Sequence, residues 1–138
     1  ATLFRSAAIQ GHCFAAGAML AMAHDWRVMR SERGFFCLPE IDINLPFPPG
    51  MDALLRAKLT PATALEAMTT GRRYGGEDAL AAGVVTSAVP EAQVLSAALE
   101  MVRPLAAKAG PNLGVIKSTM FADPLRLLSV VHPPGATS

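Results

Sequence analysis

Residues 6–25 have the sequence SAAIQGHCFAAGAMLAMAHD. They predict a short strand over 6–10, a tight loop from Gly11, and an apolar helix that opens with the small residues Ala15, Ala16 and Gly17 and runs to about His24. Residues 26–29 predict a second strand, and residues 35–38, after a polar turn, a third. Strands that alternate with a buried helix indicate α/β layering.

The rest of the chain is mostly helical in pattern. Thr60 supplies an N-cap, Pro61 suits a first helical position and Gly71 suits a closing left-handed residue, which predicts a helix over 61–70. A shorter helix is expected over 77–82 and a strand over 84–89. Apolar residues spaced by three and four predict a helix from about 91 to 109, kinked at Pro104, and a further helix that opens at Pro111.

Length and composition favour one folded domain with a real core. The chain has 138 residues, of which 51% are apolar and 17% charged, which excludes disorder driven by charge. The formal net charge is +1, with no basic block and few aromatic residues, so nucleic acid is not an expected partner. High apolarity with little charge indicates either an oligomer or a partner surface that lies in chain not shown here.

Several classes of site and location lack support. The longest apolar run covers residues 13–23, 11 in all, against the roughly 20 needed to span a membrane, and no secretory signal is recognisable. Two cysteines, Cys13 and Cys37, are too few for a disulfide scaffold and favour reduced thiols. The histidines have no ligand at metal spacing, so no metal is expected.

The start of the helix after Gly11 is the first candidate site. Small residues there leave backbone N–H groups uncovered at the positive end of the helix dipole, where they can hold a developing oxyanion. Close packing of the helix on a strand is the more common reason for small residues such as Ala15, Ala16 and Gly17 at a helix start.

Glu40 is the second candidate. Phe35, Phe36, Leu38 and Pro39 give it an apolar setting, which disfavours its charged form and prepares it for proton transfer. The alternative is a surface glutamate beside a turn. The prolines and glycine of residues 39–50 predict irregular backbone that carries Glu40, Asp42 and Phe47, and the pattern does not decide whether Asp42 shares the site.

Taken in order, these motifs resemble the enoyl-CoA hydratase/isomerase (crotonase) superfamily. The resemblance rests on the segment 8–25 with its glycine-containing turn and final Asp25, on Phe-Phe-Cys-Leu-Pro-Glu at 35–40, on the loop to Gly50, on Leu65-x-x-Met68-x-x-Gly71, and on Ala79-x-x-x-Gly83-Val-Val. It covers about residues 7–121. It implies the C-terminal part of a crotonase-like ββα superhelix over residues 1–121, followed by C-terminal helices, with residues 122–138 as a short tail.

The resemblance also implies an acyl-CoA thioester substrate whose oxygen is held by two backbone amides, the second of which matches Ala16. Hydratases of the superfamily place two glutamates around the acyl chain. The first of these positions is Met19 here and the second is Glu40. A single carboxylate suits the Δ3,Δ2-enoyl-CoA isomerases, in which one group moves a proton from C2 to C4. Gly17 then permits close approach of the substrate, and Met19, Leu38 and Phe47 are the expected acyl wall.

Family domains are about twice as long as this chain. The resemblance therefore places the first oxyanion amide and the CoA-binding loop in an N-terminal half that lies outside the given sequence. An enoyl-CoA hydratase, or a non-catalytic truncated acyl-CoA binder or oligomer partner, remains an alternative function. No cofactor is expected, because CoA is part of the substrate. The resemblance further implies a trimer-type homo-oligomer in a full-length form and a cytoplasmic or, in a eukaryote, peroxisomal location.

Overall fold

The computed structural model describes residues 1–130, and its strands form two small parallel sheets. Strands β1 and β5 flank β3 in the first sheet, where Ser6 pairs with Trp26 and Val28 with Ser87. Strands β2 and β4 form the second sheet. The strands are β1 Ser6–Ile9, β2 Cys13–Phe14, β3 Trp26–Arg30, β4 Phe36–Cys37 and β5 Ser87–Val89.

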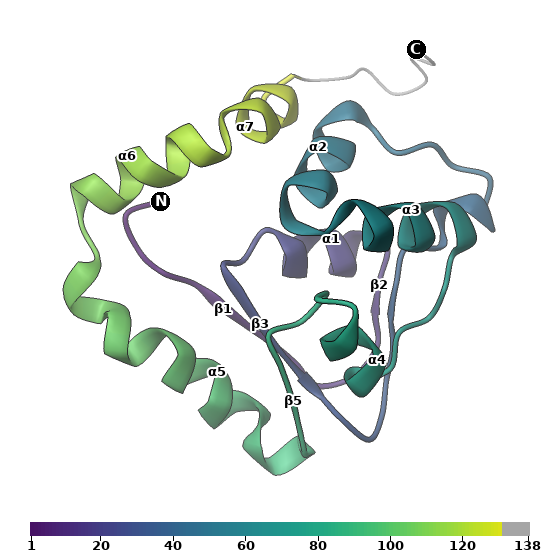
Figure 1. Cartoon of the computed structure of the whole chain (residues 1–138), viewed down its shortest axis with the longest axis horizontal. Coiled ribbons are helices and arrows are strands. Elements are labelled where there is room, and N and C mark those ends of the chain that lie inside the picture. Colours follow the sequence, from purple (N-terminus) through teal and green to yellow (C-terminus); the bar gives the residue numbers. More distant parts are fainter. Residues whose placement is uncertain (131–138) are drawn as a thin grey trace.

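Helices surround these strands on two sides (Figure 1). Helices α1 to α4 lie on one side of β1 and β3, while α5 and α6 form an arc along the other side that leads to α7, which packs on α2. The α-helices are α1 Ala16–Met22, α2 Pro49–Lys58, α3 Pro61–Thr70, α4 Gly76–Ala81, α5 Val94–Val102, α6 Pro111–Met120 and α7 Ala122–Leu128. The 3-10 helices are η1 Pro39–Ile41, η2 Glu91–Gln93 and η3 Arg103–Lys108.

Most of the predicted elements are confirmed. Helix α3 has the predicted ends: the Thr63 N–H donates to Thr60 Oγ1 over 3.2 Å, and Gly71 closes the helix with φ of 66°. Strands β1, β3 and β4 and helices α1, α4 and α6 also lie at the predicted places, within a few residues. The predicted α/β architecture is therefore present.

Three predictions of local structure need correction. Residues 39–50 are not irregular throughout, because Pro39 opens η1 and Pro49 opens α2, each at a first helical position where its missing N–H costs nothing. The helix predicted over about 91–109 is divided into three parts: η2 covers Glu91–Gln93, α5 covers Val94–Val102 and η3 covers Arg103–Lys108. The break predicted at Pro104 is present, since Pro104 has no N–H to donate, but the chain there continues as a 3-10 helix and not as a kinked α-helix. The strand expected over 84–89 is ordered as a strand only at Ser87–Val89.

Two clusters make up the core. The larger joins α1, α2, α3 and the second sheet, and contains Met19, Met22 and Met29, which confirms their interpretation as core residues. The smaller packs Val94 and Ala98 of α5 against Val28 of β3. The segment 122–138 begins with α7, and its residues 131–138 lie outside the described part of the chain.

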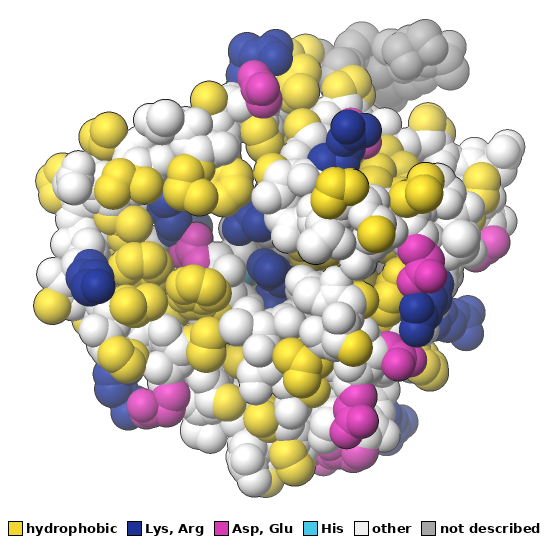
Figure 2. Space-filling view, in the orientation of Figure 1, with side chains coloured by type: hydrophobic (Ala, Val, Ile, Leu, Met, Phe, Trp, Pro, Cys, Tyr) yellow, Lys and Arg dark blue, Asp and Glu magenta, His cyan; other side chains and the backbone are white. Residues whose placement is uncertain are grey.

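Hydrophobic side chains gather on the outside of α5 and α6 (Figure 2). Leu95 is 60% exposed, Val115 64% and Met120 67%. This surface accounts for the low charge and high apolarity of the sequence, because much of the apolar content is not buried within the described residues.

Candidate functional site

The second sheet brings the two predicted site elements to one end of the molecule. Strands β2 and β4 run parallel, with Cys13 opposite Phe36 and Phe14 opposite Cys37. After β2 the chain enters α1, and after β4 it enters η1, which contains Glu40. Because parallel strands end at the same edge of a sheet, the first residue of α1 and the Glu40 segment leave from the same side.

Ala15 makes the turn between β2 and α1. Its N–H donates to the Cys37 carbonyl oxygen over 3.1 Å, and its own carbonyl oxygen accepts from the Met19 N–H over 3.0 Å. Between these two bonds its backbone takes φ of 49° and ψ of −116°, a conformation that L side chains rarely adopt. The strained residue thus lies directly before the first N–H group of α1.

The first N–H groups of α1 have no carbonyl partner within the helix. No side chain caps this helix, and no backbone bond among the described residues uses the Ala16 N–H. A Cβ added at Gly17 would meet no atom of the described residues within 4 Å. The open space at Gly17 lies outside the packed core, so the predicted packing role of this glycine against a strand has no contact to support it, whereas room for a ligand is present.

Glu40 is buried in η1, the segment that follows β4. Its side chain belongs to η1, is 8% exposed, and has an oxygen, Oε2, with no hydrogen-bond partner among the described residues. The loop after it is held by the Leu45 N–H, which donates to the Glu40 carbonyl oxygen over 2.9 Å. A buried carboxyl oxygen without a partner costs free energy, and such groups are found where a proton is bound or moved. The alternative of a surface glutamate is therefore excluded.

Charged groups surround Cys37, which lies between the two candidates. Burial raises the pKa of the Cys37 thiol, the nearby carboxylates of Asp42 and Glu40 raise it further, and the Arg73 guanidinium opposes them. The thiol donates to the Gly71 carbonyl oxygen over 3.3 Å. Asp42 itself is exposed. The carboxyl of Glu40 is thus the buried acid of this region, and Asp42 lies at its rim.

The residues predicted as an acyl wall divide into two kinds. Met19 and Leu38 are fully packed in the core cluster, at 7% and 0% exposure, while Phe47 is half-buried against the same cluster. Gly17 instead faces a groove of about 420 Å³ that runs along all of β1 and includes Leu20, which is 66% exposed. Gly17 therefore lies on this groove, which none of Met19, Leu38 and Phe47 lines.

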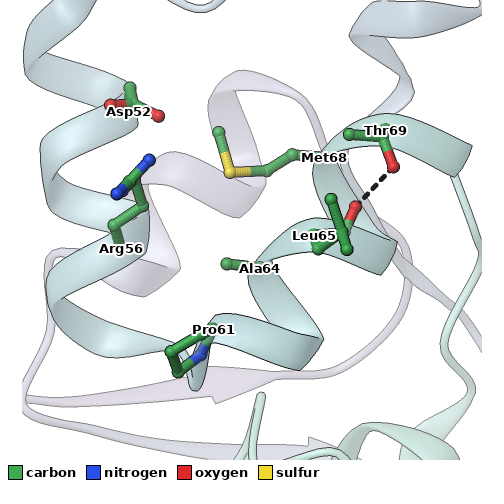
Figure 3. A pocket seen from close by; sticks show the side chains of 7 residues that line it. All are labelled: Asp52, Arg56, Pro61, Ala64, Leu65, Met68 and Thr69. Carbon is green, nitrogen blue, oxygen red and sulfur yellow. Dashed lines mark hydrogen bonds between the residues drawn. The ribbon is translucent and has the colours of Figure 1, made fainter.

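A second open hollow, which the sequence does not predict, lies between α2 and α3 (Figure 3). It has a volume of about 440 Å³, and Arg56 from α2 and Met68 from α3 extend into it. Met68 also packs on the core cluster that contains Met19 and Leu38. The spacing of Leu65 and Met68 in the sequence indicates one helical wall of this hollow. Residues 49–58, which form the other wall, begin with Pro49 and Gly50 and give no helix signal in the sequence.

Among residues 1–130, no group of three or more His, Cys, Asp or Glu side chains is close enough to hold a metal ion. Within the same residues, no helix has the length and apolarity required to cross a membrane.

The sequence is similar to that of known proteins over most of its length. The model of the enoyl-CoA hydratase/isomerase family matches residues 5–127. Enoyl-CoA delta isomerase 2, peroxisomal, of Arabidopsis thaliana is 36% identical over 122 residues, which make up 85% of this chain and 51% of that protein. The chain spans about half the length of the curated relatives it matches.

Solved structures share the fold. The human mitochondrial delta3-delta2-enoyl-CoA isomerase aligns with a TM-score of 0.82 at 28% identity, over 94% of this chain and 51% of that one. An enoyl-CoA hydratase of Mycobacterium ulcerans Agy99 aligns with a TM-score of 0.81, also at 28% identity, over 89% of this chain and 54% of that one. Proteins named for two different reactions therefore share this arrangement of strands and helices.

Proposed function

Because the chain belongs to the enoyl-CoA hydratase/isomerase family, we propose that it serves the isomerisation of 3-enoyl-CoA to 2-enoyl-CoA thioesters. The observation that carries the proposal is the buried Glu40 carboxyl, whose Oε2 has no partner among the described residues, at the sheet end that also carries the start of α1. The 36% identity to a plant enoyl-CoA delta isomerase supports the same reaction.

The proposed chemistry needs one proton-transfer group and one oxyanion donor. The Glu40 carboxylate removes a proton from C2 of the bound thioester, and the electron pair moves onto the thioester oxygen to give a dienolate. The Ala16 N–H, which has no backbone partner among the described residues, donates to that oxygen. Glu40 then returns the proton at C4, so that the double bond moves from C3–C4 to C2–C3 and the carboxylate is regenerated.

The absence of a second buried acid distinguishes this proposal from water addition. Of the acidic residues among 1–130, only Glu40 is buried; Asp25 and Asp52 are half-buried and the others are exposed. Met19 lies at the first of the two positions where the resemblance places glutamates in hydratases. It is an apolar core residue with 7% exposure. Addition of water needs a group that activates water as well as one that protonates carbon, whereas the isomerisation returns the same proton and needs one carboxylate.

The test is a turnover assay with two thioesters. The purified chain is supplied separately with a 3-enoyl-CoA and a 2-enoyl-CoA, and the conjugated double bond is followed by ultraviolet absorbance. We expect the first substrate to be converted and the second to remain unhydrated. Glu40→Gln should lower the turnover number by about 10²–10⁴-fold while acyl-CoA affinity is retained, because the amide cannot carry the proton.

Glu77→Gln is the matched control, since Glu77 is an exposed acid in the first turn of α4 and the substitution makes the same chemical change. Equal turnover in the two variants would remove Glu40 from the mechanism. An acyl-CoA titration that shows binding without turnover would instead favour a non-catalytic acyl-CoA binder.

A further inference from the structure

A smaller cavity lies where α6 and α7 approach α2. Its volume is about 180 Å³, and its wall is mostly apolar, with Leu54, Phe121 and Leu125 among its residues and Asp25, Lys58 and Lys117 as its charged ones. Figure 2 shows the surface hollowed between α6 and α2, with Lys and Arg side chains inside the hollow. No residue of the proposed proton-transfer site lines this cavity.

The acid of this cavity is already neutralised. Lys117 Nζ lies 2.6 Å from Asp25 Oδ2, and both side chains are about 15% exposed. The same oxygen accepts from the Arg5 N–H over 2.8 Å, and Lys117 also donates to the Leu3 carbonyl oxygen over 2.9 Å. Asp25 therefore has no free charge to offer a second cation.

Lys58 is the lysine of this cavity that has no ion-pair partner among residues 1–130. Its ammonium donates to the His24 carbonyl oxygen over 3.0 Å and lies 4.7 Å from the centre of the Phe121 ring. Among residues 1–130, no carboxylate lies within 4.0 Å of it. Arg27, which is 6% exposed, donates to the same His24 oxygen over 2.9 Å. Two cations thus converge on one neutral carbonyl.

The charges around the cavity sum to an excess of positive charge. Among the side chains that act on Lys58, Arg27 and Lys117 are positive and Asp25 is negative; with Lys58 itself, three positive charges face one negative charge, which leaves +2. Burial lowers the pKa of Lys58, and the neighbouring Arg27 and Lys117 lower it further, while Asp25 opposes them. A half-buried ammonium without a counter-charge is costly, and an anion in the cavity would relieve that cost.

We infer that this cavity binds a short-chain carboxylate, with a carboxylate oxygen on Lys58 Nζ and the aliphatic tail against Leu54, Phe121 and Leu125. The size fits this class, because 180 Å³ at roughly 30 Å³ for each water-sized group holds about six of them. Butyrate has six non-hydrogen atoms. The apolar wall favours a carboxylate with an aliphatic tail, because the tail can pack against the wall. A fully polar anion of similar size would place charged or polar atoms against most of the wall, which is unfavourable.

The experiment is an isothermal titration of the purified chain with sodium butyrate at constant ionic strength, set by sodium chloride. We expect saturable binding of butyrate and none of 1-butanol, which has a similar tail without the charge. Lys58→Met should weaken binding by at least about 10-fold, because it removes a charge-assisted hydrogen bond. Lys58→Arg, which keeps the charge, should retain most of the affinity.

Lys108→Met is the matched control, since Lys108 is exposed at the end of η3 and loses the same charge. The inference is overturned if Lys58→Met and Lys108→Met bind butyrate equally, or if inorganic phosphate binds as tightly as butyrate. Should Lys58→Met fail to fold, the unmodified chain decides the question through a nuclear Overhauser effect between the butyrate methyl protons and the Phe121 ring. Absence of that effect at saturating butyrate also overturns it.

Discussion

Replacement of Ala15 by glycine should make the protein more stable, although glycine is usually a destabilising substitution. Ala15 holds φ of 49° and ψ of −116°, and the bonds from its N–H to Cys37 and from Met19 to its carbonyl prevent it from relaxing. Glycine reaches this conformation without steric penalty, because it has no Cβ.

The size of the effect follows from two opposing contributions. A non-glycine residue in such a sparsely populated conformation costs of order 1–3 kcal/mol. Glycine gives back roughly 0.5–1 kcal/mol, because its unfolded chain has more conformational freedom to lose. The expected net gain of Ala15→Gly is therefore about 1 kcal/mol, within limits of about 0 and 2.5 kcal/mol, or roughly 4 °C in the melting temperature of a chain of this size.

The assay is urea unfolding followed by circular dichroism, with thermal unfolding as a second measure. The urea midpoint should rise without a change in slope, since the surface exposed on unfolding is unchanged. Ala16→Gly is the control: this neighbour has helical backbone as the first residue of α1, so glycine there should cost about 0.5–1 kcal/mol. Similar decreases of the urea midpoint in both variants would show that the Ala15 backbone is not strained.

Two further predictions concern the buried residues Cys13 and Gly76. Burial raises the pKa of Cys13 to about 11 from 9.0, so its thiolate fraction near neutral pH should be about 100-fold lower in the folded chain than in the urea-unfolded chain. Because the thiolate is the reactive form, alkylation of Cys13 by iodoacetamide, measured by mass spectrometry, should be slower by the same factor. Equal rates in the two states would contradict this prediction. Gly76→Ala should destabilise by about 1–3 kcal/mol, because its Cβ would lie 2.5 Å from the Arg30 carbonyl oxygen and 2.8 Å from Ser31 Cα, whereas Gly17→Ala, with open space around it, should be neutral or stabilising by up to about 1 kcal/mol in the same urea assay.

The sequence predicts elements well where local chemistry sets their ends. Helix α3 is the clearest case, because Thr60, Pro61 and Gly71 each satisfy a backbone requirement within a few residues of themselves. Helix α2 was missed because Pro49 and Gly50 look like loop residues, yet Pro49 occupies a first helical position and Gly50 lies against Leu128 of α7. That contact joins residues far apart in the chain, and no local pattern reports it.

For the site, the sequence identified the residues but not what brings them together. The apolar neighbours of Glu40 predicted its burial, and the structure confirms that burial. The strand β2 was not predicted, because two residues carry no periodicity, and its register with β4 is what places the start of α1 and the Glu40 segment at one edge. The strain at Ala15 was also invisible, since alanine gives no signal of a positive φ.

The candidate site depends on a segment that follows both of its parts in the chain. Strands β2 and β4 have two residues each, too few to form a stable sheet alone. Phe36 exchanges N–H donors and carbonyl acceptors with Tyr74 over 2.8 Å in each direction, and the buried Tyr74 donates its hydroxyl to Glu66 of α3 over 2.7 Å. Helix α3 and the bridge at Tyr74 therefore hold β4 against β2, and through β4 they fix the position of Glu40 relative to the N–H groups of α1.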